Sequence, residues 1–210
     1  MPTHLVEQGD HLSGIAEQYG YRDFQTLWDD AANSGLQDQG RKPHILLPGD
    51  TVEVPEPQRK TEDRATEARH RFRTPRRRLK LKLRLLTSTR EPQKDTAVRL
   101  EVAGKSGADL TTDGDGKIAD DDLPRRARIA RLIVAETEFS VQIGHLDPSG
   151  TDSGWEGRLN NLGYFVPDAT ERDADEVRSA IEEFQCDYGL TVDGEKSDAT
   201  KAKLEEVHGS

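Results

Sequence analysis

The chain has 210 residues and a formal net charge of −10, and 32% of its residues are hydrophobic while 33% are charged. Because so few residues are apolar, the chain is predicted to form several small units joined by solvated segments rather than one large enzyme core. No apolar run is long enough to span a bilayer, and the single cysteine, Cys186, excludes an internal disulfide framework.

The first predicted unit combines two short strands with two helices. A strand is predicted at residues 4–6, followed by a turn at Gly9 that needs a positive φ. Asp10 is predicted to cap the next helix, which ends at Gly20. The apolar face of this helix is formed at helical spacing by Leu12, Ile15, Ala16 and Tyr19. A second turn and strand are predicted at residues 45–55.

This unit resembles the LysM domain, a β-α-α-β module that commonly binds glycans containing N-acetylglucosamine. The resemblance is carried by residues 9–16, 19–20 and 47–55. It departs from the family at Ala31–His44, which is predicted to be a long polar connection. The resemblance implies a glycan groove between two loops, formed by Gly9, Asp10, His11 and Leu12 on one side and by Ile45, Leu46 and Leu47 on the other. A purely structural role for these residues, in the turn, the cap and the core, is the alternative.

The middle of the chain is predicted to be an antiparallel β-sandwich that follows a linker. Leu79–Leu85 alternates strictly between leucine and a basic residue, so that the leucines face a core. Further strands are predicted at residues 98–102, 108–112, 117–119, 128–134 and 138–143. The turn and strand at Thr111–Ile118, followed by Leu123-Pro124, resemble transthyretin-like and carboxypeptidase-regulatory-like domains.

Two features of this middle segment have alternative interpretations. The carboxylates of Asp109, Asp113, Asp115 and Asp120 are consistent with a calcium loop, but the spacing departs from that of an EF-hand and favours a β-turn. The basic run at residues 71–84 is either a solvated strand face or a docking surface for an acidic partner. No aromatic residue lies among its leucines, so nucleic-acid binding is not predicted.

The C-terminal part is predicted to form three helices, at residues 154–163, 173–188 and 198–207, with Asp198 capping the third. Cys186 is predicted to be a partly buried, inert thiol. The sequence resembles the three-helix peptidoglycan-binding domain at residues 158–164, 177–185, 188–194 and 198–200. That resemblance implies a binding loop that contains Tyr164 and Phe165. The predicted division is 1–56 LysM-like, 57–68 linker, 69–146 sandwich and 147–210 peptidoglycan-binding-like.

The combined interpretation is a non-enzymatic peptidoglycan-binding protein with no catalytic residues, no metal, no cofactor, no nucleic-acid partner and no membrane span. The arrangement resembles small LysM proteins associated with type VI secretion and other contractile injection systems. An adaptor that docks a spike or effector protein without binding glycan is the alternative, and a wall hydrolase with an unrecognised site is a third hypothesis. Residues 1–4 lack the features of a secretory signal peptide. We therefore expect a cytoplasmic protein, or one that a contractile system exports to the periplasm or to a target-cell wall.

Overall fold

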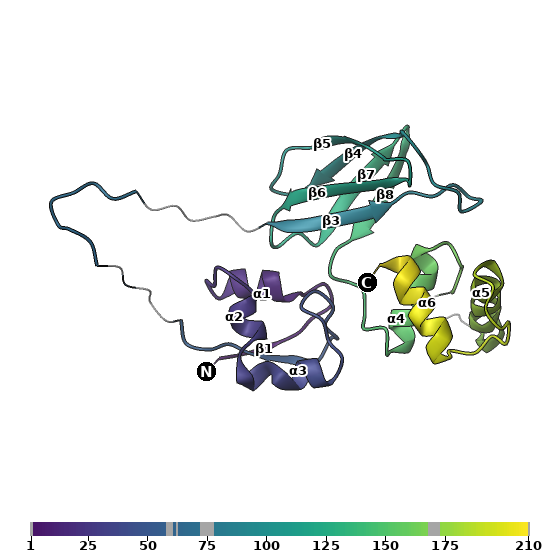
Figure 1. The fold of residues 1–210 in the computed structure, drawn as a ribbon, viewed down its shortest axis with the longest axis horizontal. Coiled ribbons are helices and arrows are strands. Elements are labelled where there is room, and N and C mark those ends of the chain that lie inside the picture. Colours follow the sequence, from purple (N-terminus) through teal and green to yellow (C-terminus); the bar gives the residue numbers. More distant parts are fainter. Residues whose placement is uncertain (1, 58–60, 62, 72–77, 168–172, 210) are drawn as a thin grey trace.

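The computed structural model describes residues 2–57, 61, 63–71, 78–167 and 173–209. The fold is α+β, with antiparallel sheets and helices, as predicted. Three separate clusters of buried hydrophobic side chains lie in the N-terminal, middle and C-terminal parts of the chain, which we call the N-terminal unit, the sandwich and the C-terminal unit (Figure 1). Parts of the predicted linker and of the predicted basic run, at residues 58–60, 62 and 72–77, lie outside the described residues.

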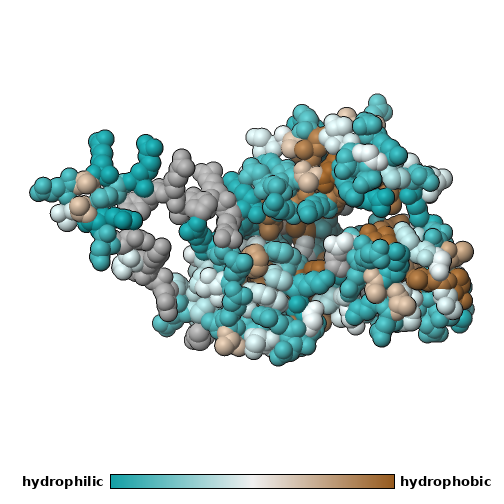
Figure 2. Space-filling model, in the orientation of Figure 1, coloured by the Kyte–Doolittle hydropathy of each residue, from teal (hydrophilic) through white to brown (hydrophobic). Residues whose placement is uncertain are grey.

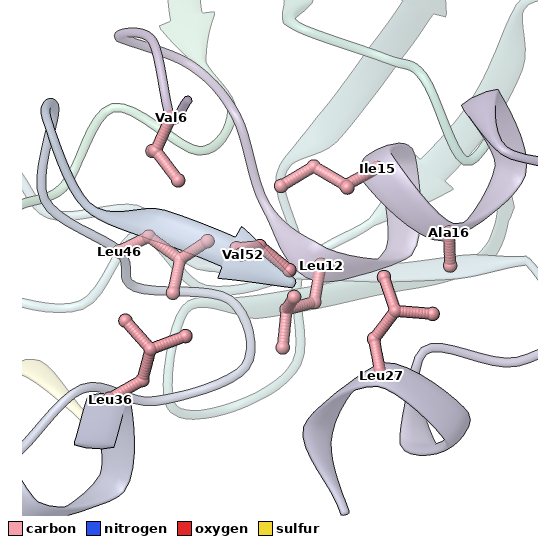
Figure 3. Close-up of a cluster of buried hydrophobic side chains, with 8 residues drawn as sticks. All are labelled: Val6, Leu12, Ile15, Ala16, Leu27, Leu36, Leu46 and Val52. Carbon is pink, nitrogen blue, oxygen red and sulfur yellow. The ribbon is translucent and has the colours of Figure 1, made fainter. Parts of the chain in front are cut away.

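The N-terminal unit pairs two short strands antiparallel and packs short helices against them. Its core brings together the side chains of Leu12, Ile15, Leu27 and Val52, which point toward one another in Figure 3. Gly9 has a φ of +89°, as its place in the turn requires. The elements are β1 (Thr3–Leu5), α1 (Leu12–Gln18), α2 (Gln25–Trp28), the 3₁₀ helix η1 (Ala31–Asn33), α3 (Ser34–Asp38) and β2 (Thr51–Glu53).

Two predictions for this unit are wrong. The segment Ala31–His44 is not simply a polar connection, because it contains η1 and α3 and buries Leu36 in the core. The residue that caps α1 is His11 rather than Asp10, since the ring Nδ1 of His11 accepts the Gly14 N–H at 3.2 Å. Both errors have one cause: short polar stretches carry too little periodicity to place a helix or its cap.

The middle unit is a sandwich of two antiparallel sheets, one with strand order β5-β4-β7-β8 and one with β3-β6 (Figure 1). The alternation predicted for its first strand is confirmed, because Leu79, Leu81 and Leu83 pack against the core while Lys80 and Lys82 are exposed. The strands are β3 (Leu79–Arg84), β4 (Ala97–Val102), β5 (Ala108–Thr111), β6 (Lys117–Leu123), β7 (Ile129–Val134) and β8 (Thr137–Gln142).

Strand β6 runs four residues further than the predicted 117–119, through three consecutive aspartates. Aspartate is disfavoured in strands, so the sequence gives little sign of this extension. Each carboxylate finds a basic partner: Asp120 pairs with Lys105, Asp121 with Lys80 at 2.9 Å, and Asp122 with Arg78 at 3.2 Å. These ion pairs offset the repulsion that a run of three carboxylates would otherwise produce.

The C-terminal unit packs three helices around Leu159, Phe184 and Leu204, with both ends of the second helix close to their predicted places. The cap of the third helix is Ser197 rather than Asp198, because the Ser197 hydroxyl accepts the Thr200 N–H. Cys186 is exposed rather than partly buried. The helices are α4 (Asp152–Asn161), α5 (Ala174–Asp187) and α6 (Asp198–His208). Across the described residues, no helix combines the length and apolar character needed to cross a membrane.

Candidate functional site

The two loops of the N-terminal unit that the sequence singles out lie next to each other. The N–H of Leu12 donates to the carbonyl of Pro43 at 3.0 Å, which ties the start of α1 to the second loop. The rings of His11 and His44 meet edge to face, with centroids 6.1 Å apart. The Leu47 N–H is held by the Asp50 carboxylate at 2.8 Å. The chain therefore brings residues 9–12 and 45–47 to one side of this unit.

Most apolar residues in these loops belong to the core. Leu12 and Leu46 are buried and point into the unit (Figure 3). Ile45 is buried as well, and Leu47 is half-buried. A ligand between the loops would therefore meet the backbone at most of these positions rather than their side chains.

Asp10 is held by groups on three sides. Its carboxylate accepts the Glu7 N–H at 3.0 Å, bonds His4 Nε2 at 3.1 Å and pairs with Arg128 of the sandwich at 2.6 Å. Burial raises the pKa of Asp10, but the Glu7 N–H, His4 and Arg128 together outweigh burial, so that its pKa is lowered. Asp10 is thus an ionised anchor between two units.

His11 is a buried, neutral imidazole. Only 4% of the residue is exposed, and its Nδ1 acts as the cap acceptor of α1. Burial, with a smaller contribution from His44, lowers the pKa of His11 to about 4. Near neutral pH this ring is therefore uncharged, and its Nδ1 remains free of a proton and able to accept the Gly14 N–H.

The sandwich packs closely against the Gly9 loop. The Gln8 amide donates to the His145 carbonyl at 2.9 Å. A Cβ on Gly9 would lie 2.8 Å from the His145 ring, and a Cβ on Gly144 would lie 2.8 Å from the Gly9 carbonyl oxygen. Glycine at both positions is what permits this approach. One side of the predicted glycan loop is therefore covered by the chain itself.

Two hollows remain at this junction. The first, of about 520 Å³, is mostly apolar and is lined by His11, Phe24 and His44 on one side and by Leu81 and Ile143 on the other. The second, of about 530 Å³, is polar and lies beside Asp10, Gln18, Arg126 and Arg128. Figure 2 shows apolar surface along the border where the sandwich meets the neighbouring units.

In the C-terminal unit, the two predicted loop residues differ sharply. Tyr164 is 1% exposed, its hydroxyl donates to Asp187 at 2.9 Å, and its ring packs edge to face on Phe184. Burial and the Asp187 hydrogen bond raise the pKa of Tyr164. The guanidinium of Arg90, from the β3–β4 connection, lies 4.1 Å from the centre of the Tyr164 ring. Tyr164 is therefore a core residue.

Phe165, in contrast, is 76% exposed and borders a shallow hollow of about 540 Å³ on α5. The rest of this hollow is lined by Asp175, Glu176, Ser179, Ala180 and Glu183. An exposed aromatic ring beside hydroxyl and carboxylate groups offers both an apolar platform and hydrogen-bond acceptors. Phe165 is one of the residues predicted from the sequence to bind ligand, whereas the α5 residues beside it are not. The sequence gives one indication of these α5 residues: at helical spacing they lie beside the apolar stripe that contains Ala180.

The four aspartates considered for calcium are engaged with nitrogen donors. Asp113 accepts the backbone N–H groups of Asp115 and Lys117 and so closes the β-turn. Asp109 pairs with Arg99, Asp115 with Lys117, and Asp120 with Lys105. No cluster of three or more His, Cys, Asp or Glu suited to a metal occurs in the part of the chain that the structure describes.

Comparison with known families gives a match in one of these regions, the C-terminal unit. Residues 156–204 match the family model described as "Putative peptidoglycan binding domain". The match covers most of α4, all of α5 and the first part of α6, so the C-terminal unit contains a peptidoglycan-binding domain. Neither the curated proteins nor the solved structures gave a match to the chain.

Proposed function

We propose that this protein is a non-enzymatic binder of peptidoglycan, and that the hollow beside Phe165 is its principal contact with the polymer. The observation that carries the proposal is the family match over residues 156–204, which includes this hollow on α5. The exposed Phe165 ring supports it, because the apolar face of a sugar ring packs well on an aromatic side chain. Ser179 and the nearby carboxylates could accept hydrogen bonds from hydroxyl and amide groups of the polymer.

The N-terminal unit would provide a second, weaker glycan contact. Its resemblance to LysM and the adjacency of loops 9–12 and 45–47 favour this role, whereas the sandwich contacts at Gly9 and Asp10 restrict it. On this proposal the functional division is 1–56, 57–68, 69–146 and 147–210. The protein would act in the cytoplasm, or in the periplasm or target-cell wall after export by a contractile system of the type VI kind.

The test is co-sedimentation with purified peptidoglycan sacculi. We expect wild-type protein to pellet with sacculi and Phe165→Ala to lose at least about tenfold in affinity, which corresponds to about 1.4 kcal/mol. Phe139→Ala is the matched control, because Phe139 is also exposed but lies in the sandwich. Wild-type protein that stays in the supernatant, or equal pelleting by both variants, would refute the proposal. Release of soluble muropeptides would refute its non-enzymatic part.

An adaptor function is the second candidate. The observation that favours it is that the sandwich, rather than open solvent, meets one side of the N-terminal glycan loop. The adaptor would hold a spike or effector protein and would need no free glycan groove. Co-purification with such a protein, retained by Phe165→Ala, would favour this function over peptidoglycan binding.

A further inference from the structure

Among the described residues, strand β3 is hydrogen-bonded to another strand along one edge only. It pairs with β6 and with no other described strand. The Leu85 N–H donates to the Gly116 carbonyl, so the backbone of Leu85 faces the β6 side. In an antiparallel pair this direction alternates, which places the backbone groups of Leu83 toward β6 and those of Lys82 and Arg84 away from it. Within the described ranges, no hydrogen bond reaches the backbone of Lys82 on this outer edge.

The sandwich also has an incomplete second layer. Its larger sheet has four strands and its smaller sheet two. On β8, Phe139 lies opposite Leu132 and so shares its face, which is the face of the core. Yet Leu132 is 5% exposed and Phe139 is 50% exposed. The two-stranded sheet therefore covers β7 but leaves part of the inner face of β8 open.

The 520 Å³ hollow lies beside the open edge of β3. On the sandwich side it is lined by five consecutive residues, 78–82, as expected where a strand presents its edge, since side chains from both faces then border the space. Its opposite wall is formed by His11, Ser13, Phe24 and His44 of the N-terminal unit, so an added strand would lie between the two units. Ile143 also lines it and continues the inward row of β8 beyond Phe139 and Val141. The backbone edge of β3 and the apolar side chain of Ile143 thus meet at this hollow.

We propose that this edge accepts an extended segment of a different protein, which adds as a third strand beside β3. Backbone donors and acceptors of Lys82 and Arg84 would supply the ladder, and side chains of the new strand that point inward would contact Ile143. Outward side chains of the new strand would lie beside Lys80 and Lys82. We therefore propose that these side chains are acidic, because opposite charges on neighbouring strands attract. A second copy of this chain is disfavoured, because pairing β3 with itself would place basic residues opposite basic residues.

The occupant is therefore a strand that alternates apolar and acidic residues. Lys80 can contact it, since its present partner Asp121 is 62% exposed and that pair is a weak surface ion pair. The proposal is independent of peptidoglycan binding, because it uses neither Phe165 nor the hollow on α5.

The experiment uses the full chain and a fluorescein-labelled ten-residue peptide of alternating valine and glutamate. A peptide of alternating valine and lysine is the control ligand. We expect the glutamate peptide to bind and the lysine peptide to fail. Lys82→Glu should reverse this preference. Lys82→Pro, which removes the outward N–H, should weaken binding about tenfold more than Lys82→Gln, which removes only the charge.

Amide hydrogen exchange gives a second readout at single residues. In the free protein the Lys82 amide should exchange fast and the Leu83 amide slowly, and the bound peptide should protect Lys82. The proposal is overturned if the Lys82 amide is already protected without peptide, if both peptides bind equally, if neither binds, or if binding leaves the exchange of β3 unchanged.

Discussion

The sandwich contacts the two outer units in different ways. On the N-terminal side, the Arg125 guanidinium donates to the carbonyls of Ser13 and Tyr21 at 2.9 and 3.2 Å, which are fixed parts of the backbone. On the C-terminal side, one side chain, Arg90, reaches the carboxylates of Glu183 and Asp187 at 2.5 and 2.8 Å, and its one bond to a backbone carbonyl, that of Gly163, is long at 3.4 Å. Those two carboxylates are 52% and 42% exposed, and exposed ion pairs contribute little. The comparison indicates that the N-terminal unit is held firmly and that the C-terminal unit can reorient.

Internally, however, the two outer units have one feature in common: each buries an amide side chain that hydrogen-bonds to backbone groups of neighbouring loops. In the N-terminal unit Asn33 donates to the carbonyls of Leu27 and Glu53 and accepts the Glu53 N–H. In the C-terminal unit Gln185 donates to Asp193 and Thr200 and accepts the N–H groups of Asp193 and Gly194. Both side chains are almost fully buried.

The largest expected effect comes from removing these amides. Each bond lost leaves a buried polar group unsatisfied, at about 1–3 kcal/mol per group. We expect Gln185→Ala to lower the free energy of unfolding of the C-terminal unit by about 4 kcal/mol and Asn33→Ala to lower that of the N-terminal unit by about 3 kcal/mol.

Tryptophan fluorescence in urea can measure each unit separately, because Trp28 packs in the N-terminal core and Trp155 in the C-terminal core. Trp155→Phe leaves Trp28 as the reporter, and Trp28→Phe leaves Trp155. If either amide variant unfolds at the same urea concentration as its single-tryptophan parent, the proposed role of that amide is wrong.

The roles of these two amides could not be predicted from the sequence. The strands of the sandwich and the long helices were predictable because their apolar residues repeat at a regular spacing, as in β3 and α5. Asn33 and Gln185 are polar residues whose burial no periodicity indicates, and only the folded chain brings their partners to them. The same holds for the site: Phe165 is next to a recognisable motif, whereas one contact of the Tyr164 ring comes from Arg90, which lies 74 positions earlier in the sequence.

The second prediction concerns pH. His11 has a folded pKa of about 4, below its unfolded value of about 6.5. As the pH falls from about 6.5 to about 4, the unfolded chain binds a proton at His11 that the folded unit excludes. The free energy of unfolding of the N-terminal unit therefore drops by about 3 kcal/mol. The stability is fully present above about pH 6.5. His208 has a similarly lowered pKa of about 4, caused by burial and then by Arg158. Because His208 is only half-buried and more screened by solvent than His11, it gives the C-terminal unit a smaller dependence of the same sign.

Urea unfolding of the single-tryptophan proteins between pH 4 and 7 measures this dependence. His11→Asn keeps a side chain that can cap α1 and removes the titrating group. It should reduce the slope of the N-terminal profile to the part that comes from other groups such as His44, whose pKa burial also lowers, and leave the C-terminal profile unchanged. His208→Asn should change only the C-terminal profile. An N-terminal profile that keeps its full slope in His11→Asn would show that another group is responsible.

A third, smaller effect separates the two roles of Asp10. Asp10→Ala removes its bonds within the N-terminal unit as well as its ion pair with Arg128, so we expect a loss of about 2 kcal/mol. Arg128→Gln removes only the cross-unit pair, and because Arg128 is 53% exposed the loss should stay below about 1 kcal/mol. Thermal unfolding of the two variants measures both values. Equal losses would mean that the contact with the sandwich, and not the local turn, is what Asp10 stabilises.

The variant expected to change stability least, Arg90→Gln, should change the motion of the C-terminal unit relative to the sandwich most clearly. Arg90→Gln removes the ion pairs with Glu183 and Asp187 and the contact with the Tyr164 ring. Because these pairs are exposed, the C-terminal unit should lose less than about 1 kcal/mol. Backbone ¹⁵N relaxation should nevertheless show α5 tumbling faster relative to the sandwich than in the wild type. Arg99→Gln is the matched control, since Arg99 also pairs with two carboxylates, Glu101 and Asp109, but within the sandwich. If α5 and the sandwich keep a common tumbling time in Arg90→Gln, contacts other than Arg90 hold the C-terminal unit in place, and the contrast between the two outer units is weaker than these contacts indicate.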